Sequence, residues 1–425
     1  MELTKSRLLS EGSVWHIGSL SAVYLSQGLS AGTLFALTTF LVSIGASVAE
    51  ISLLLSITMI PWTLKVFLGP IIDSFTLSRF GRRRFWIIIS QIAMMLALLP
   101  LTLIEIQEIN LTLIALLTLH NAFVAVSDIS IDALAADSLH EDQLANANGF
   151  MWGSKTLGRG SGMALATSIF YGYGVNEGFM ILILLMSLAF LFPLFSTELS
   201  YKAGQQSKSY KNRLTLSELM SGITQSLFNK SAFAAMIFML FSNIGYGIFD
   251  VIYNEFYIEV LGWSGEEIGY LRPIGMWIGG LLGLSIGLLT FYSGKRLLLL
   301  FFITCQAFIF LMVSTFTPET ENSLSTAAII ATDLVDAGWS VLIFSILMAL
   351  CTSNTSATNF GIFMGFGNIS TIIGNNLAPL VLGSGDYSFA FMIAALTLIP
   401  CWLCGYLSLI HISEPTRQEA IADAG

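Results

Sequence analysis

Long apolar runs alternate with short polar connections along almost the whole chain of 425 residues. A helix needs about 20 apolar residues to cross the hydrocarbon core of a bilayer. By this rule the pattern predicts an all-α membrane protein with twelve membrane-spanning helices. We expect them at residues 16–42, 48–73, 85–105, 110–136, 145–172, 176–197, 231–258, 265–290, 296–316, 326–351, 356–383 and 387–406.

A longer polar stretch, residues 198–230, separates the predicted helices into two sets of six. Five of its residues are Lys or Arg, which indicates a cytoplasmic linker between an N-terminal bundle (residues 1–197) and a C-terminal bundle (residues 231–406). A basic turn opens the third helix (FGRR, residues 80–83) and recurs 213 residues later at the ninth (SGKR, residues 293–296). This repetition is typical of two-halved transporters.

Composition supports a polytopic membrane protein whose main partner is the lipid bilayer. The chain is 55% hydrophobic and 11% charged, with a mean hydropathy of +0.78, whereas soluble chains carry about 25% charged residues. The net charge of −9 does not point to nucleic acid as a partner, because the two signs are segregated along the chain. The four cysteines lie in apolar segments and are expected to pack rather than to form disulfides or bind metal.

The basic residues predict the orientation of the helices. Fourteen of the 18 Lys and Arg lie in the N-terminus, in the loops after the second, sixth and eighth helices, or in the C-terminal tail. The loops on the opposite side hold acidic residues and no basic ones. By the positive-inside rule, both termini are expected in the cytoplasm and the protein in the inner cell membrane.

Two acids and two bases interrupt the fourth and fifth predicted helices. Asp128 and Asp132 are spaced i,i+4, as are Lys155 and Arg159, so each pair shares one helix face. A charge near the bilayer centre costs about 2.5–3.5 kcal/mol on insertion scales. At 1.5 Å per residue, Asp128 and Lys155 lie at similar depths, about 13 and 15 Å from the cytoplasmic side. We therefore expect an Asp128–Lys155 ion pair.

The other two charges have different expected partners. Asp132 lies closer to the cytoplasm and is expected to turn toward Lys65 of the second helix. Arg159 lies near mid-membrane without an acid at its level, so it is expected to face a water-filled cavity and bind an anion. The alternative is a purely structural ion network. Since desolvation rivals attraction in a buried pair, stabilisation alone explains such charges poorly.

The connection between the second and third helices carries a recognisable motif. Residues 69–73 (GPIID) and 81–84 (GRRR) resemble the cytoplasmic signature of the major facilitator superfamily, G-x-x-x-D-R-x-G-R-R, with a longer spacer. The resemblance implies a latch in which the acid pairs with the arginines; the alternative is a topology anchor alone. The latch residues would be Lys65, Gly69, Asp73, Gly81, Arg82 and Arg83.

Two further stretches narrow the resemblance to one branch of that superfamily. Residues 65–73 and residues 127–134 (SDISIDAL) resemble patterns of the AmpG-type muropeptide permeases and acetyl-CoA transporters, with Ser127 in place of a Gln. This resemblance implies inward transport of anhydro-muropeptides together with protons. It covers the first five helices well and the second half weakly.

Charged residues of the second half have simpler expected roles. Asp250, on the seventh helix, is expected to act as a periplasmic gate or in proton entry; the alternative is one polar residue of an interfacial belt. Arg272 is expected beside the loop that leads into the eighth helix. Asp333 and Asp336 are expected to open the tenth helix, where the helix dipole favours acids.

Neutral residues complete the candidate set. Asn375 and Asn376, on the eleventh helix, either bind solute or hydrogen-bond a neighbouring helix. Glycines recur every four residues on the eighth helix and predict close packing between helices, which is either static or a sliding contact between the two halves. They are Gly275, Gly279, Gly283 and Gly287.

The end of the chain has a different character. Residues 407–417 (LSLIHISEPTR) match a translated reading frame of a widely used sequencing adapter. We therefore expect residues 407–425 to be a non-native tail.

Together these features predict a monomeric, proton-coupled secondary transporter of an anionic or amphiphilic solute, with muropeptide uptake as the leading hypothesis. The solute would bind Arg159 and compete for Lys155, and Asp128, left without its partner, would take up a proton. The alternative is a symporter or exporter of another solute, such as a sugar, a drug or an acyl-CoA.

A membrane-embedded enzyme and a channel are less consistent with the sequence. The four histidines lack metal-ligand spacing, so neither enzymatic activity nor a metal or other cofactor is expected. A two-halved layout with a latch does not favour a channel.

Overall fold

The computed structural model describes residues 11–65, 67, 68, 72, 82–138, 141–195, 230–350, 356–383 and 385–407. In this part of the chain the secondary structure is all helical. The N-terminal half contains α2 (Glu11–Ser43), α3 (Val48–Thr63), α5 (Arg82–Leu98) with η1 (Leu99–Thr102), α6 (Leu111–Ser138), α7 (Glu141–Gly172) and α8 (Val175–Phe195).

The C-terminal half begins with α10 (Lys230–Ser242), α11 (Ile244–Glu255) and η2 (Phe256–Val260), which together make one crossing. Its other elements are α12 (Gly265–Ser293), α13 (Lys295–Val313), α14 (Asn322–Ala349), α15 (Ser356–Leu382), α16 (Tyr387–Leu396) and α17 (Ile399–Leu407). Each of the twelve predicted spans therefore coincides with a helix or with consecutive helices. The all-α prediction is confirmed.

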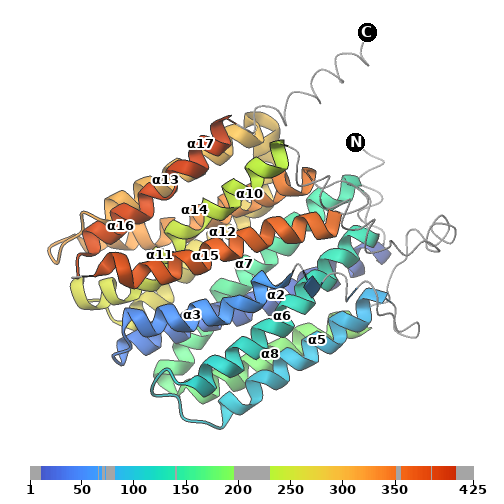
Figure 1. Ribbon diagram of the computed structural model, residues 1–425. Coiled ribbons are helices and arrows are strands. Elements are labelled where there is room, and N and C mark those ends of the chain that lie inside the picture. The colour runs from blue at the N-terminus through green and yellow to red at the C-terminus, as the bar shows by residue number, and fades with distance from the viewer. Residues whose placement is uncertain are drawn as a thin grey trace.

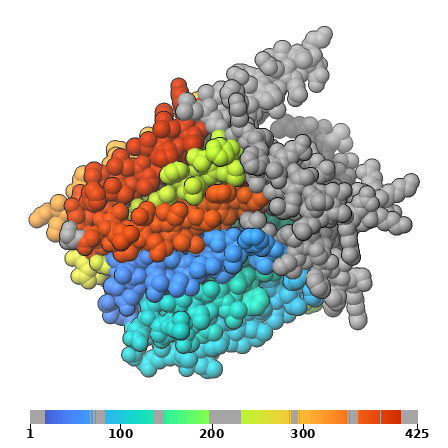
Figure 2. All heavy atoms as spheres, in the orientation of Figure 1, coloured from blue at the N-terminus to red at the C-terminus, as the bar shows by residue number. Residues whose placement is uncertain are grey.

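The helices form two groups that lie side by side (Figure 1). The blue-to-green N-terminal helices and the yellow-to-red C-terminal helices meet along two helix pairs, α3 with α15 and α7 with α12. The boundary between α3 and α15 is visible on the surface (Figure 2). Three hydrogen bonds cross it along its length: Ser52 Oγ donates to Asn375 O (2.7 Å), Asn376 Nδ2 to Ser56 Oγ (2.8 Å), and Asn368 Nδ2 to Trp62 O (2.8 Å).

The helices at this boundary differ in composition from the others. In the described residues, eight helical segments are long and apolar enough to cross a membrane, including α2, α6, α8, α13 and α14. Of the four interface helices, α3 is shorter, α7 and α12 carry charged residues, and α15 carries asparagines. Buried charged residues also lie on other helices: Asp128 on α6, Asp250 on α11 and Asp333 on α14.

Two of the crossings are interrupted. The break between α10 and α11 lies at Asn243, whose backbone N–H donates to Ser370 Oγ (2.9 Å). The break between α16 and α17 lies at residues 397 and 398. Backbone groups freed by such breaks must find partners inside the protein, because lipid offers none.

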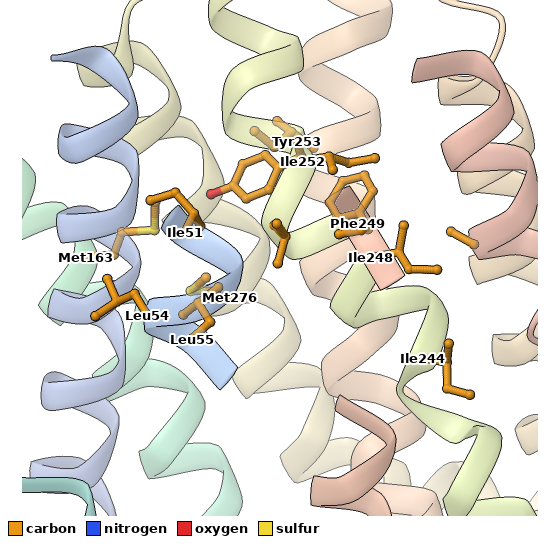
Figure 3. Close-up of a cluster of buried hydrophobic side chains, with 14 of the residues drawn as sticks. Ile51, Leu54, Leu55, Met163, Ile244, Ile248, Phe249, Ile252, Tyr253 and Met276 are labelled. Carbon is orange, nitrogen blue, oxygen red and sulfur yellow. The ribbon is translucent and has the colours of Figure 1, made fainter. Parts of the chain in front are cut away.

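A continuous apolar core joins the two halves (Figure 3). It combines side chains of α3, such as Ile51 and Leu54, with Met163 of α7, Met276 of α12 and several residues of α11. Phe249 of α11 is buried and stacks on Tyr253, with ring centroids 5.4 Å apart. The apolar packing places α11 and α12 against the N-terminal half.

The glycine pattern of α12 packs within one half. A Cβ atom at Gly275 would overlap the carbonyl oxygen of Ile330, one at Gly279 would meet Ala337, and one at Gly283 would meet Val341, all residues of α14. These three glycines therefore pack closely against a helix of their own half, which corresponds to the static packing that was one of the two alternatives. The surroundings of Gly287 lie outside the described residues.

Glycines also bring α2 and α7 together. Cβ atoms at Gly28 and Gly32 of α2 would overlap the carbonyl oxygens of Lys155 and Arg159, respectively. In the opposite direction, a Cβ atom at Gly162 of α7 would overlap the carbonyl oxygen of Leu29. The backbone segment that carries both α7 cations is thus held against α2 at a distance that only glycine permits.

Replacing Gly32 by Ala is expected to lower stability by about 1–3 kcal/mol, because the methyl group forces α2 away from α7. Gly18 is the matched control, since it lies on the same helix and a Cβ atom there meets nothing within 4 Å. Gly18→Ala is expected to change stability by less than about 1 kcal/mol. Thermal unfolding of the purified proteins in detergent compares the two; equal midpoints would contradict the packing argument.

Several predicted features lie outside the described residues. They are residues 198–229 of the linker, residues 408–425 of the expected tail, and Gly69, Asp73 and Gly81 of the latch. Arg82 begins α5, but its side chain also lies outside the description.

Candidate functional site

The first cluster of interior charges is centred on Asp128 of α6. Lys65, two residues beyond α3, donates to Asp128 Oδ2, and Lys155 Nζ of α7 lies 3.4 Å from Asp128 Oδ1. The exposed fractions are 5% for Lys65, 4% for Asp128 and 8% for Lys155. The expected Asp128–Lys155 pair is therefore present, and Lys65 joins it as a second cation. We call these three residues the Asp128 cluster.

Aromatic rings surround the two lysines. The Nζ atom of Lys155 lies 5.2 Å from the ring centroid of Tyr24, 5.1 Å from that of Trp62 and 4.9 Å from that of Trp152. Trp62 also lies 4.6 Å from Nζ of Lys65. Ring faces attract cations, and most strongly where water is excluded. The two lysines are thus stabilised both by the Asp128 carboxylate and by the faces of the aromatic rings.

Asp132 has a different partner from the one expected. Its Oδ1 accepts a hydrogen bond from the Tyr24 hydroxyl of α2 at 2.5 Å, whereas Lys65 pairs with Asp128. The expected Asp132–Lys65 pair is wrong. The two acids share one face of α6 but lie one turn apart along it, so Asp132 meets Tyr24 of α2 and Asp128 meets the end of α3.

The second cluster is centred on Arg272 of α12, whose exposed fraction is 0%. Its Nε donates to Asp333 Oδ2 (2.8 Å), its Nη1 to the Tyr253 hydroxyl (2.5 Å), and its Nη2 to Asp250 Oδ1 (2.8 Å) and the Tyr246 hydroxyl (2.9 Å). Every guanidinium nitrogen therefore has a partner. We call these residues the Arg272 cluster.

Sequence reasoning placed this cluster wrongly. Arg272 lies seven residues inside α12 rather than beside a loop. Because α14 begins at Asn322, Asp333 and Asp336 lie 11 and 14 residues inside it and not at its start. A signal was available: acids one turn apart in an apolar run, with an arginine inside the eighth helix, form the same pattern as Asp128 and Lys155.

Arg159 of α7 meets an acid from the other half. Its Nη1 lies 3.6 Å from Asp336 Oδ2 of α14, so the expectation that Arg159 lacks an acid at its level is wrong. Among the ion pairs of the described residues, this one joins the two halves. The Nε atom of Arg159 is buried and has no hydrogen-bond partner in the described part of the chain.

The three sets of charges form one band across the middle of the protein. Lys155 and Arg159 lie one turn apart on α7 and reach into opposite halves. The Phe35 ring lies 5.6 Å from the guanidinium carbon of Arg159 and 4.6 Å from that of Arg272. Among the described residues the band holds five carboxyl groups and four cations, and one of the cations, Arg272, faces two of the acids; the members are Asp128, Asp132, Asp250, Asp333, Asp336, Lys65, Lys155, Arg159 and Arg272.

Asn375 and Asn376 lie at the boundary between the halves. Asn375 accepts the Ser52 hydroxyl through its backbone oxygen, and Asn376 donates to Ser56 through its side chain. Contact with a neighbouring helix, one of the two expected roles, is thus present for both residues. Their binding of solute stays a prediction.

The arginines at the start of α5 anchor that helix end. Arg84 donates from Nε to Pro193 O (3.3 Å) and from Nη2 to Leu194 O (2.5 Å), both at the end of α8. Arg83 is buried. Lys65, expected in the latch, is instead part of the Asp128 cluster.

Known proteins share both the sequence pattern and the fold. Two relatives, each named "Putative transporter AmpG 4", come from Rickettsia felis (26% identity, 60% of this chain and 63% of the relative) and Rickettsia conorii (26%, 56% and 58%). The chain thus spans about three fifths of the length of both. An uncharacterized protein of Haemophilus influenzae is 24% identical over 85% of each chain.

The fold is similar to that of the nucleoside transporter NupG, with a TM-score of 0.67, 14% identity and coverage of 93% of this chain and 99% of NupG. At this identity the likeness concerns the fold alone. The family model of the Major Facilitator Superfamily matches residues 20–359, which include both charge clusters and the pair between the halves. Because this family model covers most of the chain, the protein belongs to the Major Facilitator Superfamily.

Proposed function

We propose that the protein is a proton-coupled secondary transporter that takes up an anionic or amphiphilic solute across the inner membrane by alternating access. Anhydro-muropeptides are the leading substrate class, because of the resemblance to AmpG-type permeases. In this proposal residues 1–197 and 231–406 act as two moving bundles joined by a cytoplasmic linker. The protein works as a monomer with both termini in the cytoplasm.

The observation that carries the proposal is the band of nine charged residues inside the protein. The Asp128 cluster and Asp132 lie in one half, the Arg272 cluster lies in the other, and the Arg159–Asp336 pair joins the halves. Ionisable side chains within a membrane are costly and usually mark the path of a substrate or a proton. Among the four cations of the band, Arg159 has a buried donor, Nε, without a hydrogen-bond partner in the described residues, so it is the proposed contact for an anionic group. Lys155, one turn away on α7, is the second cation proposed to contact the same anionic group.

The partners of the two acids on α6 suggest where a proton binds. Asp128 lies between two lysines, so it keeps one cationic partner even when Lys155 turns toward a solute. Asp132 has a hydroxyl as its hydrogen-bond partner. A buried carboxyl without a cation favours its neutral form, so we assign the coupling proton to Asp132 rather than to Asp128. Asp250 is held by Arg272, and its part in proton transfer stays a prediction.

The aromatic set around Lys155 is consistent with a solute that presents a ring. Trp62 and Trp152 are half-buried, and Trp152 stacks on Phe344 of α14 with centroids 4.1 Å apart. Stacked aromatic faces suit amphiphilic solutes with one apolar side. The alternative assignment is a symporter or exporter of another solute, such as a sugar, a drug or an acyl-CoA.

Uptake into proteoliposomes tests the proposal. Vesicles carrying the purified protein are given an acidic exterior and, in separate assays, labelled anhydro-muropeptide, uridine or glucose. We expect concentrative uptake of the anhydro-muropeptide, lost when a protonophore dissipates the gradient, and no uptake of the neutral solutes beyond protein-free vesicles. Accumulation of a neutral solute alone would contradict the anionic assignment.

A further inference from the structure

We infer that Asp336 competes with the anionic group of the solute for Arg159, and so acts as a specificity-determining residue of the transport site. This inference rests on the proposed function, since it concerns the same arginine. It adds a residue from the opposite half, one that sequence reasoning assigned to the start of a helix.

The contact between Arg159 and Asp336 is incomplete. A guanidinium commonly binds a carboxylate through two parallel N–H donors, 2.7–2.9 Å from the oxygens. Here one nitrogen, Nη1, lies 3.6 Å from one oxygen, and the neighbouring Nε stays without a partner. By contrast, the Arg272 nitrogens all donate, with distances of 2.5–2.9 Å. A ligand with two anionic oxygens would satisfy Arg159 better than Asp336 does.

The pair is also accessible. The Arg159 and Asp336 side chains are 20 and 16% exposed, against 1 and 2% for Arg272 and Asp333. An incoming carboxylate or phosphate group can therefore reach Arg159 without unfolding of the Arg272 cluster. Charge repulsion between such a group and Asp336 would oppose binding as long as Asp336 remains beside the arginine.

Asp336 has a second hydrogen-bond partner that remains when Arg159 turns away. The indole N–H of Trp339, three residues further along α14, donates to Asp336 Oδ1 at 3.2 Å. This hydrogen bond keeps the carboxylate partly satisfied after Arg159 turns to the solute. In this competition the anionic group of the solute replaces Asp336 on Arg159, and the Asp336 carboxylate keeps the hydrogen bond from Trp339.

Binding measurements on variants in nanodiscs test the inference. The probes are anhydro-muropeptide and its analogue with amidated carboxylates. Asp336→Asn is expected to tighten binding of the carboxylate form about tenfold, which corresponds to about 1.4 kcal/mol, and to leave binding of the amidated form unchanged. Trp339→Phe, which removes the second partner of Asp336, is expected to weaken binding of the carboxylate form and gives an independent reading if Asp336→Asn fails to fold. Unchanged or weaker carboxylate binding in Asp336→Asn would overturn the inference.

A second readout separates this inference from the proposed substrate. If the parent protein binds neither probe, the substrate assignment has failed, and modification of Arg159 by phenylglyoxal is then measured by peptide mass spectrometry. Release of Arg159 from Asp336 is expected to speed this modification about fivefold in Asp336→Asn and to leave Arg272 unmodified in both proteins. Equal rates of Arg159 modification would overturn the inference without reference to any solute.

Discussion

An Arg272→Met protein is expected to be less stable than the parent by about 3–5 kcal/mol, the usual result of removing one partner from a buried ion network. The reason is local: Asp250 and Asp333, with exposed fractions of 9 and 3%, both lose the guanidinium that satisfies them. The midpoint of thermal unfolding in detergent, followed by intrinsic fluorescence, measures the effect.

Two further variants show whether the loss of stability comes from the two buried carboxylates that are left without a cation. Arg272→Met combined with Asp250→Asn and Asp333→Asn is expected to recover a large part of the stability, because no buried charge remains. Arg296→Met is the matched control, since Arg296 donates to Tyr406 O at the exposed start of α13 and its loss is expected to cost about 1 kcal/mol. Equal losses in Arg272→Met and Arg296→Met would contradict the central place of Arg272.

The second large effect concerns coupling. Asp132→Asn is expected to lose pH-driven accumulation of solute about tenfold or more while it retains counterflow, the exchange of labelled for unlabelled solute at equal pH. The physical reason is that an amide cannot take up the coupling proton that we assign to the Asp132 carboxyl, yet it can still accept the Tyr24 hydrogen bond. Both modes are measured in the same proteoliposomes.

Asp128→Asn serves as the contrasting variant. It leaves Lys65 and Lys155 buried without their carboxylate, so accumulation and counterflow are both expected to fall, together with the unfolding temperature. If instead Asp128→Asn keeps counterflow and loses only accumulation, the coupling proton belongs to Asp128 and not to Asp132.

The helices of this fold follow closely from the sequence, because a span in lipid requires an apolar run of nearly fixed length. Predicted spans such as 48–73 and 265–290 begin at the residues where α3 and α12 begin. The breaks at Asn243 and at residues 397 and 398 were not predicted. At Asn243 no charge or proline interrupts the apolar run, whereas Pro400, the second residue of α17, is a signal for the other break that was available in the sequence.

The charge pairs were harder to predict than the helices. Asp128 and Lys155 lie on consecutive spans, so depth arithmetic was enough to pair them. Arg159 and Asp336 lie 177 residues apart, in different halves, and their contact depends on how α7 and α14 approach each other. An error of four residues in the start of α14, 326 instead of Asn322, was sufficient to leave Asp333 and Asp336 near the membrane surface in the sequence-based picture.

The central claim is that solute movement is coupled to protons through Asp132, the acid of the band whose hydrogen-bond partner is a hydroxyl and not a cation. Internal pH of proteoliposomes, reported by a trapped indicator dye, tests it when anhydro-muropeptide is added outside at equal pH. The account predicts internal acidification with about one proton for each solute molecule that enters, and none in Asp132→Asn. Solute uptake by the parent protein without acidification, or equal acidification in Asp132→Asn, would contradict it.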